Sequence, residues 1–216
     1  MIAIIIPDRG DRPKMLANCI RLMEKQTAEH VIYMVSEKPK SDLPDLTYRY
    51  RKAYETLSKN ELVEVDLIVF IENDDWYHPE YIEFIYKSWK SKGKPDLIGI
   101  DYTYYYHLGL KKYFKYEHAG RASMMNTAIK PGLNFKWPND SYRFVDMFLW
   151  SNLRGVTISP EKIYSIGMKG HGEGMSGGTG HVNKLHRFVN DDNGFLENTL
   201  DEESLNFYKQ YEYVAT

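Results

Sequence analysis

The chain has 216 residues, of which 43% are hydrophobic and 27% charged, so it can bury a core and is not a disordered polymer. Its 28 Lys and Arg nearly balance its 30 Asp and Glu, which argues against a protein whose main task is to hold nucleic acid through phosphates. The single cysteine, Cys19, excludes a disulfide framework and a cysteine-based zinc cluster. No apolar run has the length of a membrane span and no signal peptide fits, so we expect no membrane partner and a cytoplasmic location.

The first hundred residues alternate short apolar runs with helical patterns. Four runs are apolar enough to be buried strands, over residues 2–6, 31–35, 67–71 and 97–100. Between them, helical patterns begin near Pro13, over residues 48–60 and after Pro79, and the last of these ends at Gly93. This alternation predicts an α/β domain with parallel strands and crossover helices.

The pattern changes after residue 100. Residues 101–118 alternate about Gly109, which predicts an antiparallel hairpin, and a further strand and a helix are expected within 121–132 and 141–153. Residues 191–216 hold seven acidic residues and one Lys. We therefore expect one domain over residues 1–190, a mixed and mostly parallel sheet flanked by helices with an antiparallel hairpin, followed by an acidic C-terminal extension over 191–216.

Three carboxylates, Glu72, Asp74 and Asp75, follow the apolar run 67–71 in the sequence ENDDWYHP. In a parallel α/β sheet, ligands bind just beyond the carboxyl ends of the strands. Acids so close together repel one another unless a cation or hydrogen-bond donors stabilise them, and Mg²⁺ or Mn²⁺ suits such oxygen ligands. The alternative is that the acids cap the next helix, but capping needs only one or two of them, so we favour the metal site.

A fourth acid, Asp146, lies inside the otherwise apolar sequence FVDMFLW. At helical spacing it falls beside Val145 and Phe148, at the edge of the core. Partial burial raises the pKa of a carboxylate, which suits a general base. The sequence alone leaves open the alternative of a solvent-facing helix residue paired with Arg143 or Trp150.

The segment KGHGEGMSGGTGH (169–181) is rich in glycine. Glycines let the backbone approach a ligand and let a loop close over it, and His171, His181 or His186 is available as a metal ligand. The alternative is a mobile surface loop. No P-loop pattern for phosphate binding occurs in the chain.

Two basic stretches are candidates for contacts with phosphate. Arg9 and Arg12 leave the first apolar run in the sequence DRGDRP (8–13), where arginines suit a diphosphate or a base, although a surface ion pair is the alternative for at least one of them. Residues 111–143 carry seven Lys or Arg against Glu117 and Asp140, next to the tyrosine-rich hairpin. This bias suits either a nucleic-acid backbone or a solvated face.

Taken in chain order, these segments resemble the nucleotide-sugar-dependent glycosyltransferases of the GT-A fold, a Rossmann-like fold, and most of all the inverting family 2. The resemblance is carried by the glycine-rich segment and by IIIPDRGDRPKMLANCIRLMEKQT (4–27), VIYMVSE (31–37), LIVFIENDDWYHPEYIE (67–83) and PNDSYRFVDMFLWSNL (138–153). The segment 67–83 is similar to the stretch that contains the family's DxD metal motif. Two positions depart from the family: Glu72 replaces the first Asp of that motif, and Val145 replaces the Glu of the Glu-Asp pair that opens the catalytic helix.

The resemblance implies a role for each matching residue. Asp146 falls on the position of the catalytic base, and Asp74 and Asp75 keep the carboxylates that bind the metal ion, with His181 or else His171 as the third ligand. Glu37 stands where the second strand ends in an acid that contacts uracil. The residues implied to contact the nucleotide-sugar are Pro7, Arg9, Arg12, Glu37, Arg51, Glu72 and Asp74.

Together, these roles imply a metal-dependent inverting glycosyltransferase of hexosyltransferase type, which uses Mn²⁺ or Mg²⁺ and moves a sugar from a nucleotide-sugar, preferably a UDP-sugar, to an acceptor hydroxyl. The segments look most like small phage and bacterial members, so the expected acceptor is a hydroxymethylated base in phage DNA or a glycan. The location of a phage-encoded member is the host cytoplasm. Two alternatives stay open: a nucleotidyltransferase, which usually needs a glycine-rich loop after the first strand, and a non-catalytic module that binds carbohydrate or nucleotide.

Overall fold

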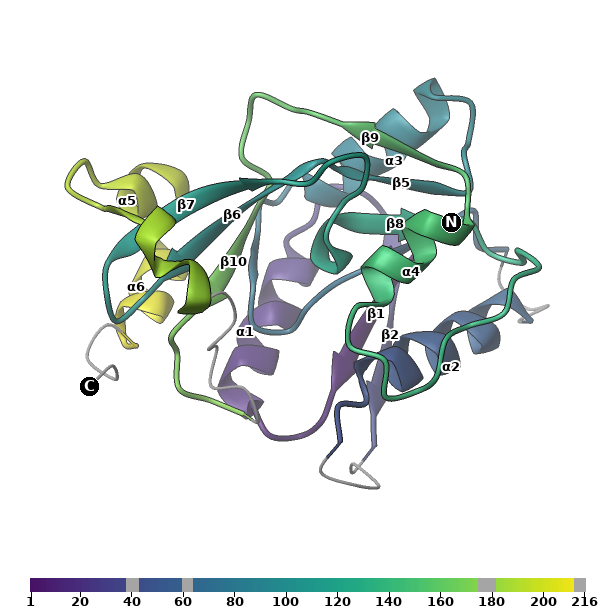
Figure 1. Cartoon of the computed structure of the whole chain (residues 1–216), viewed down its shortest axis with the longest axis horizontal. Helices are drawn as coiled ribbons and strands as arrows, with labels where there is room; N and C mark the ends of the chain where they lie inside the picture. The colour runs from purple at the N-terminus through teal and green to yellow at the C-terminus, as the bar shows by residue number, and fades with distance from the viewer. Residues whose placement is uncertain (38–42, 60–63, 175–181, 212–216) are drawn as a thin grey trace.

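The computed structural model describes residues 1–37, 43–59, 64–174 and 182–211, which form two β-sheets with helices packed around them (Figure 1). The first sheet holds four strands from the first hundred residues together with two later strands. The second sheet lies beside it and is built mainly from later segments of the chain. The predicted α/β fold, with a mixed sheet flanked by helices, is confirmed.

The first sheet has six strands in the order β2-β1-β3-β8-β5-β9, and only β8 runs antiparallel to its neighbours. The strands are β1 (Ile2–Asp8), β2 (His30–Ser36), β3 (Leu67–Phe70), β5 (Leu97–Ile100), β8 (Thr127–Ile129) and β9 (Gly155–Ile158). All four strands predicted in the first hundred residues are present. Because β1 pairs in parallel with both β2 and β3, their carboxyl ends meet at one edge of the sheet.

The second sheet has five strands in the order β11-β7-β6-β10-β4, of which the sequence predicts only the hairpin formed by β6 and β7. The strands are β4 (Trp76–Tyr77), β6 (Tyr102–His107), β7 (Lys112–Glu117), β10 (Ser165–Lys169) and β11 (Val189–Asn190). β10 pairs in parallel with β6 and antiparallel with β4. This pairing places the carboxylates that precede β4 next to the end of β10.

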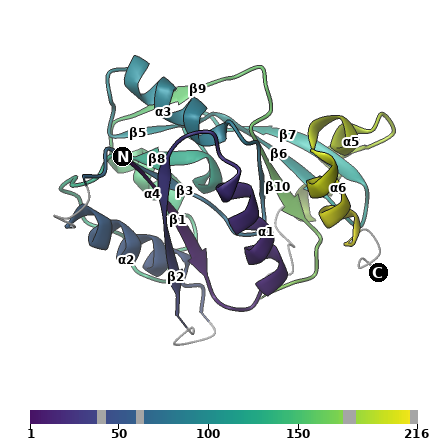
Figure 2. The ribbon, with the colours of Figure 1, turned by 180° about the vertical axis from the view of Figure 1, so that it is seen from behind.

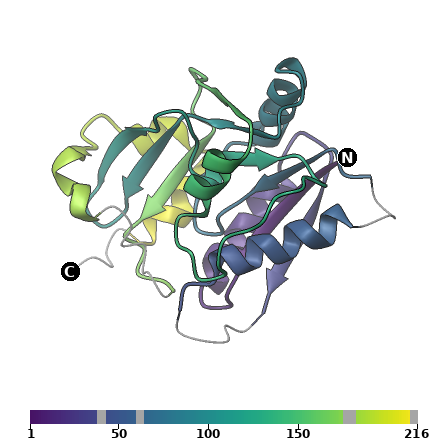
Figure 3. The same ribbon diagram turned by 45° about the vertical axis from the view of Figure 1, so that its right-hand side comes forward.

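Helices cover both faces of the first sheet. Alternate residues of β1 point to opposite faces, so Ile4 and Ile6 pack with α1 and α3, whereas Ala3 and Ile5 pack with α2 and α4 (Figures 2 and 3). The helices are α1 (Pro13–Glu24), α2 (Leu46–Ser58), α3 (Tyr81–Ser91), α4 (Val145–Asn152), α5 (Phe195–Thr199) and α6 (Glu202–Lys209), with 3₁₀ turns η1 (Met124–Asn126) and η2 (Val182–Arg187). Within the described residues, none of these helices is long and apolar enough to cross a membrane.

The acidic C-terminal segment packs back onto the domain and shares its core. α5 and α6 lie beside α1 and the second sheet (Figure 2). The Tyr208 side chain is completely buried, and its hydroxyl accepts a hydrogen bond of 3.2 Å from the Asn18 amide of α1. The Phe195 ring stacks on the Tyr113 ring of β7 with 4.0 Å between centroids. Residues 195–211 therefore help to hold α1 and the second sheet in place.

Candidate functional site

A cavity of about 470 Å³ opens at the carboxyl ends of the parallel strands. Its lining includes Lys169 at the end of β10 and five residues that the sequence predicts to contact a nucleotide-sugar, namely Pro7, Arg9, Arg12, Glu72 and Asp74. These residues come together because β1 and β3 are neighbouring parallel strands whose ends lead directly into DRGDRP and ENDDWYHP. We call this space the first cavity.

The three predicted carboxylates form one cluster at this edge of the sheet. Glu72, Asp74 and Asp75 each offer an oxygen, and the three oxygens lie within 4.8 Å of one another. Burial raises the pKa of Glu72 and of Asp75, and it does so despite the nearby ammonium group of Lys169, which acts in the opposite direction. Glu72 and Asp75 therefore need a nearby positive charge to stay ionised.

Asp75 faces the protein interior, and its side chain is completely buried. One oxygen, Oδ1, accepts a hydrogen bond of 2.9 Å from the backbone N–H of Met168 and lies 3.5 Å from Nζ of Lys169. The other oxygen, Oδ2, is buried and has no hydrogen-bond partner among the described residues. An unpartnered buried carboxylate oxygen beside two other acids fits a hard divalent ion, because Mg²⁺ and Mn²⁺ prefer oxygen ligands.

Asp74 lines the first cavity and is surrounded by positive charge and hydrogen-bond donors. Its Oδ2 accepts hydrogen bonds from Nη1 of Arg12 at 2.5 Å and from Nε2 of His171 at 3.2 Å. Although burial favours the protonated form, the His171 hydrogen bond and the charges of Lys169 and Arg12 hold the pKa of Asp74 well below its usual value. Asp74 is therefore ionised at neutral pH and can serve as a metal ligand.

His171 is one of the two predicted candidates for the third metal ligand, and it is buried beside Asp74. The backbone N–H of Glu173 donates to its Nδ1 at 3.1 Å, so the neutral imidazole carries its proton on Nε2, which donates to Asp74. Tyr211 donates in turn to Oε1 of Glu173 at 2.7 Å. The other candidate, His181, lies outside the described residues.

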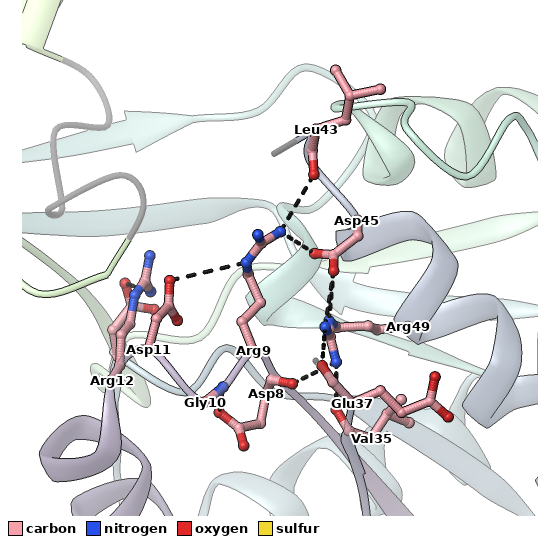
Figure 4. A network of polar contacts seen from close by, with 11 residues as sticks. Asp8, Arg9, Gly10, Asp11, Arg12, Val35, Glu37, Leu43, Asp45 and Arg49 are labelled. Carbon is pink, nitrogen blue, oxygen red and sulfur yellow. Dashed lines mark hydrogen bonds and ion pairs between the residues drawn. The ribbon is translucent and has the colours of Figure 1, made fainter. Parts of the chain in front are cut away.

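The two arginines of DRGDRP are both ion-paired and both line the first cavity. Nη1 of Arg9 lies 2.6 Å from Oδ1 of Asp45 (Figure 4). Arg12 is paired with Asp74. The sequence offered two interpretations of these arginines, an ion pair or a contact with the ligand. Each arginine forms an ion pair and also lines the cavity. Because charge-assisted contacts to phosphate are strong, both remain suited to a diphosphate.

A third arginine, Arg49, is part of this network, and the sequence does not reveal it. Its guanidinium is almost completely buried and pairs at 2.8 Å with Asp45, the residue that precedes the same helix (Figure 4). It also donates to backbone carbonyls at the ends of β1 and β2, those of Asp8, Val35 and Glu37. Arg49 thus ties the ends of β1 and β2 together and itself lines the first cavity.

Two predicted nucleotide-sugar residues do not line the first cavity. Arg51 pairs with Asp140, with 2.9 Å between Nε and Oδ1, and lines a separate surface cavity beside Trp137. It stands two positions after Arg49 on α2, and a two-residue step turns a side chain to the opposite side of a helix. The carboxylate of Glu37 accepts a hydrogen bond of 2.9 Å from Tyr48 and pairs with Lys52.

Asp146 lines a second cavity of about 420 Å³. The two cavities adjoin, because Leu46, Glu72, Arg143 and Lys169 line both of them. Asp146 lies in the first turn of α4 and is paired with Arg121 at 2.5 Å, not with Arg143 or Trp150. Burial raises the pKa of Asp146 although Arg121 opposes this effect, so the predicted direction of the shift is confirmed.

Comparisons with known proteins agree with this arrangement at the level of the fold. No protein-family model matches the chain, and no curated protein matches it in sequence. The structure of S. aureus TarS 1–349 in complex with UDP-GlcNAc matches with a TM-score of 0.55 at 13% identity, over 81% of this chain and 60% of that chain. The UDP complex of TarS 1–349 matches with a TM-score of 0.49 at 11% identity, over 79% of this chain and 61% of that chain. TarS is a GT-A-type glycosyltransferase, and this chain, which spans about 60% of that structure, has a GT-A-like glycosyltransferase fold.

Proposed function

We propose that the chain is a nucleotide-sugar-dependent glycosyltransferase that uses a UDP-sugar and a divalent ion. The observation that carries the proposal is the pair of adjoining cavities, one lined by Arg9, Arg12 and the acidic cluster, the other by Asp146. The GT-A-like fold, and the UDP-GlcNAc bound to the TarS structure, support a UDP-sugar as the donor. Transfer to an acceptor hydroxyl needs just these two neighbouring spaces, one for each substrate.

The first cavity is proposed to hold the donor. Pro7, Arg9, Arg12, Glu72 and Asp74 line it and are proposed to contact the nucleotide-sugar, with the two arginines next to the diphosphate. Mn²⁺ or Mg²⁺ would be held by Asp74 and Asp75, with His181 or His171 as the third ligand. When bound, such an ion supplies positive charge that neutralises the diphosphate of the departing UDP.

In the second cavity, Asp146 is proposed to act as the catalytic base. Its carboxylate takes the proton from the acceptor hydroxyl as the hydroxyl oxygen attacks the anomeric carbon. The bond from the anomeric carbon to the diphosphate breaks, and UDP leaves with the electron pair. A single displacement of this kind inverts the anomeric configuration. Arg121 favours the ionised form of the Asp146 carboxylate and orients it, which opposes the effect of its burial.

Several finer features belong to the same proposal. The transferred sugar is a hexose, the acceptor is a hydroxymethylated DNA base or a glycan, and the enzyme works in the cytoplasm. Glu37 would contact the uracil from the end of β2. Arg51 would contact the nucleotide-sugar from the outer side of α2. Residues 1–190 are the catalytic domain and 191–216 an extension that steadies it, for which the Tyr208 and Tyr211 contacts are the support.

The first test is thermal stability against a panel of nucleoside diphosphates and nucleotide-sugars, with and without Mn²⁺. A ligand that binds only the native state raises Tm by mass action, and at 100 times its Kd the gain is about 2.7 kcal/mol. For a chain of this size, that corresponds to a rise of roughly 5 to 10 °C. We expect this rise with UDP and UDP-sugars in Mn²⁺ and a smaller one in EDTA.

The same panel separates the alternatives. A nucleotidyltransferase would be stabilised more by a nucleoside triphosphate than by a nucleotide-sugar. A carbohydrate-binding module would respond to free sugars and ignore UDP. Indifference to every nucleotide, with and without the ion, contradicts the proposal.

A further inference from the structure

The second cavity contains more positive than negative side chains. Four cationic residues line it, Arg121, Arg143, Lys169 and Lys184, against the two carboxylates Glu72 and Asp146. The chain as a whole has a formal net charge of −2, so this excess is a local property. A pocket for a neutral sugar has no need of such an excess, because hydroxyl groups are bound by neutral and acidic partners as readily as by cations.

Two of the four cations already have partners. Arg121 is paired with Asp146 at 2.5 Å, and Lys169 lies 3.5 Å from Asp75. Arg143 and Lys184 take part in no ion pair among the described residues. They therefore bring two uncompensated positive charges to the wall of a cavity in which the base also lies.

The surroundings of Lys184 hold its charge at the cavity wall. Nζ of Lys184 lies 3.9 Å from the centroid of the Tyr116 ring, a cation–π contact with a residue of β7 that lines the same cavity. Arg187 lies over the same ring at 5.5 Å but does not line the cavity. Lys184 and Arg187 thus lie over the same ring, but only Lys184 lines the second cavity.

We propose that the acceptor carries a phosphate ester next to the hydroxyl that receives the sugar, and that Arg143 and Lys184 bind this phosphate. The inference rests on the proposed function and, of the two acceptors proposed there, selects the glycan and gives it a phosphate. A phosphate monoester has a charge of about −1.5 to −2 at pH 7, which matches the two unpaired cations. Arginine offers a planar pair of donors and lysine a compact charge, the two groups that proteins use to bind phosphate.

The position of the phosphate follows from the two cavities. Arg143 lines both, so it stands where donor and acceptor meet, whereas Lys184 lines only the second. A phosphate bound by both residues lies in the cavity that Asp146 also lines, which brings the hydroxyl of the same acceptor within the space of the base. The proton of that hydroxyl passes to Asp146, its oxygen bonds to the anomeric carbon, and the UDP leaves with the electrons of the broken bond, so the acceptor phosphate takes no part in the covalent change.

The test must separate this phosphate from the diphosphate of the donor. The full chain is first saturated with UDP and Mg²⁺, and glycerol 2-phosphate is then titrated in and followed by NMR chemical shifts, with glycerol and glucuronate as matched probes. We expect saturable binding of glycerol 2-phosphate at least tenfold tighter than that of either other probe. In Lys184→Gln the binding should weaken at least fivefold, whereas Arg187→Gln, which removes the same charge beside the same ring, should change it less than twofold.

Each result decides the question. Equal binding of glycerol and glycerol 2-phosphate overturns the inference, as does equal weakening by Lys184→Gln and Arg187→Gln. Binding of glucuronate as tight as that of glycerol 2-phosphate indicates a general anion site and rejects the assignment of phosphate. Failure of UDP to bind in the first step is a separate result, which removes the proposed function and this inference with it.

Discussion

Asp146→Asn is expected to lower kcat for sugar transfer by about 10³-fold while leaving the Kd of UDP within twofold of the wild type. General-base catalysis contributes roughly 10²- to 10⁴-fold, and an amide cannot accept the proton of the hydroxyl. Donor binding should persist because Asp146 lines the second cavity and not the first. Release of UDP from a UDP-sugar, with water as the acceptor, measures the rate without knowledge of the natural acceptor, and calorimetry measures the Kd.

A matched control and a pH profile distinguish loss of the base from general damage. Asp140→Asn makes the same chemical change at an exposed acid that is paired with Arg51, and it should leave kcat unaltered. The wild-type kcat should fall as the pH decreases through the pKa of Asp146, since the ionised form is the base. Burial raises that pKa, so the fall should be centred above about 3.9, the usual value for Asp. If Asp146→Asn instead weakened UDP binding and retained transfer, the assignment of Asp146 as the catalytic base would be wrong.

The strands and helices of the first sheet could be predicted because their signals are local. A continuous apolar run such as residues 2–6 is typical of a buried strand, and the helix predicted to begin near Pro13 packs Met15, Cys19, Leu22 and Met23 into the core. The position of the acidic cluster followed from one further rule, that parallel strands present ligands at their carboxyl ends. In agreement with this rule, Asp74 lines the first cavity.

The parts of the site that escaped prediction depend on contacts between distant segments. Arg49 looks like any basic residue of a surface helix, and only the packing of α2 against the ends of β1 and β2 makes it a buried clamp. β4 has two residues, and its partner β10 comes some ninety residues later, so periodicity carries no signal for the pair. The link from Tyr211 to Glu173 likewise requires the C-terminal segment to return to the core.

Asp74 and Asp75 illustrate the same limit within one dipeptide. The sequence treats the two carboxylates alike, yet Asp74 lines the first cavity, whereas Asp75 turns inward to the backbone of β10. Successive residues at a strand end point in different directions, and which of them meets the cavity is decided by the pairing of β4 with β10. The acid that meets the ligand is therefore the one whose removal should matter most for donor binding.

Asp74→Ala is accordingly expected to abolish the effect of the metal on UDP binding. In the wild type, UDP should bind at least tenfold more tightly in Mn²⁺ than in EDTA, because an ion held at the acidic cluster shares its charge with the diphosphate. In the variant, both conditions should give the same weak affinity. Calorimetry measures this affinity, and the EPR signal of free Mn²⁺ measures metal binding without any turnover.

Two further variants show whether the loss belongs to the carboxylate itself. Asp11→Asn removes one negative charge from the wall of the same cavity but leaves the acidic cluster intact, so the metal should still strengthen UDP binding. Asp74→Asn keeps an oxygen that can accept from Arg12 and His171 but removes the charge, and it should behave like Asp74→Ala.

The affinity of the Asp74→Ala variant for UDP without metal depends on Arg12. In Asp74→Ala its guanidinium loses the carboxylate that it holds at 2.5 Å, so Asp74 no longer neutralises the charge of Arg12 when the diphosphate of UDP binds. The affinity in EDTA should therefore be no lower than in the wild type, even though the affinity in Mn²⁺ falls. If Mn²⁺ still strengthens UDP binding in Asp74→Ala, the ion is not held by Asp74, and the metal site must be sought elsewhere in the chain.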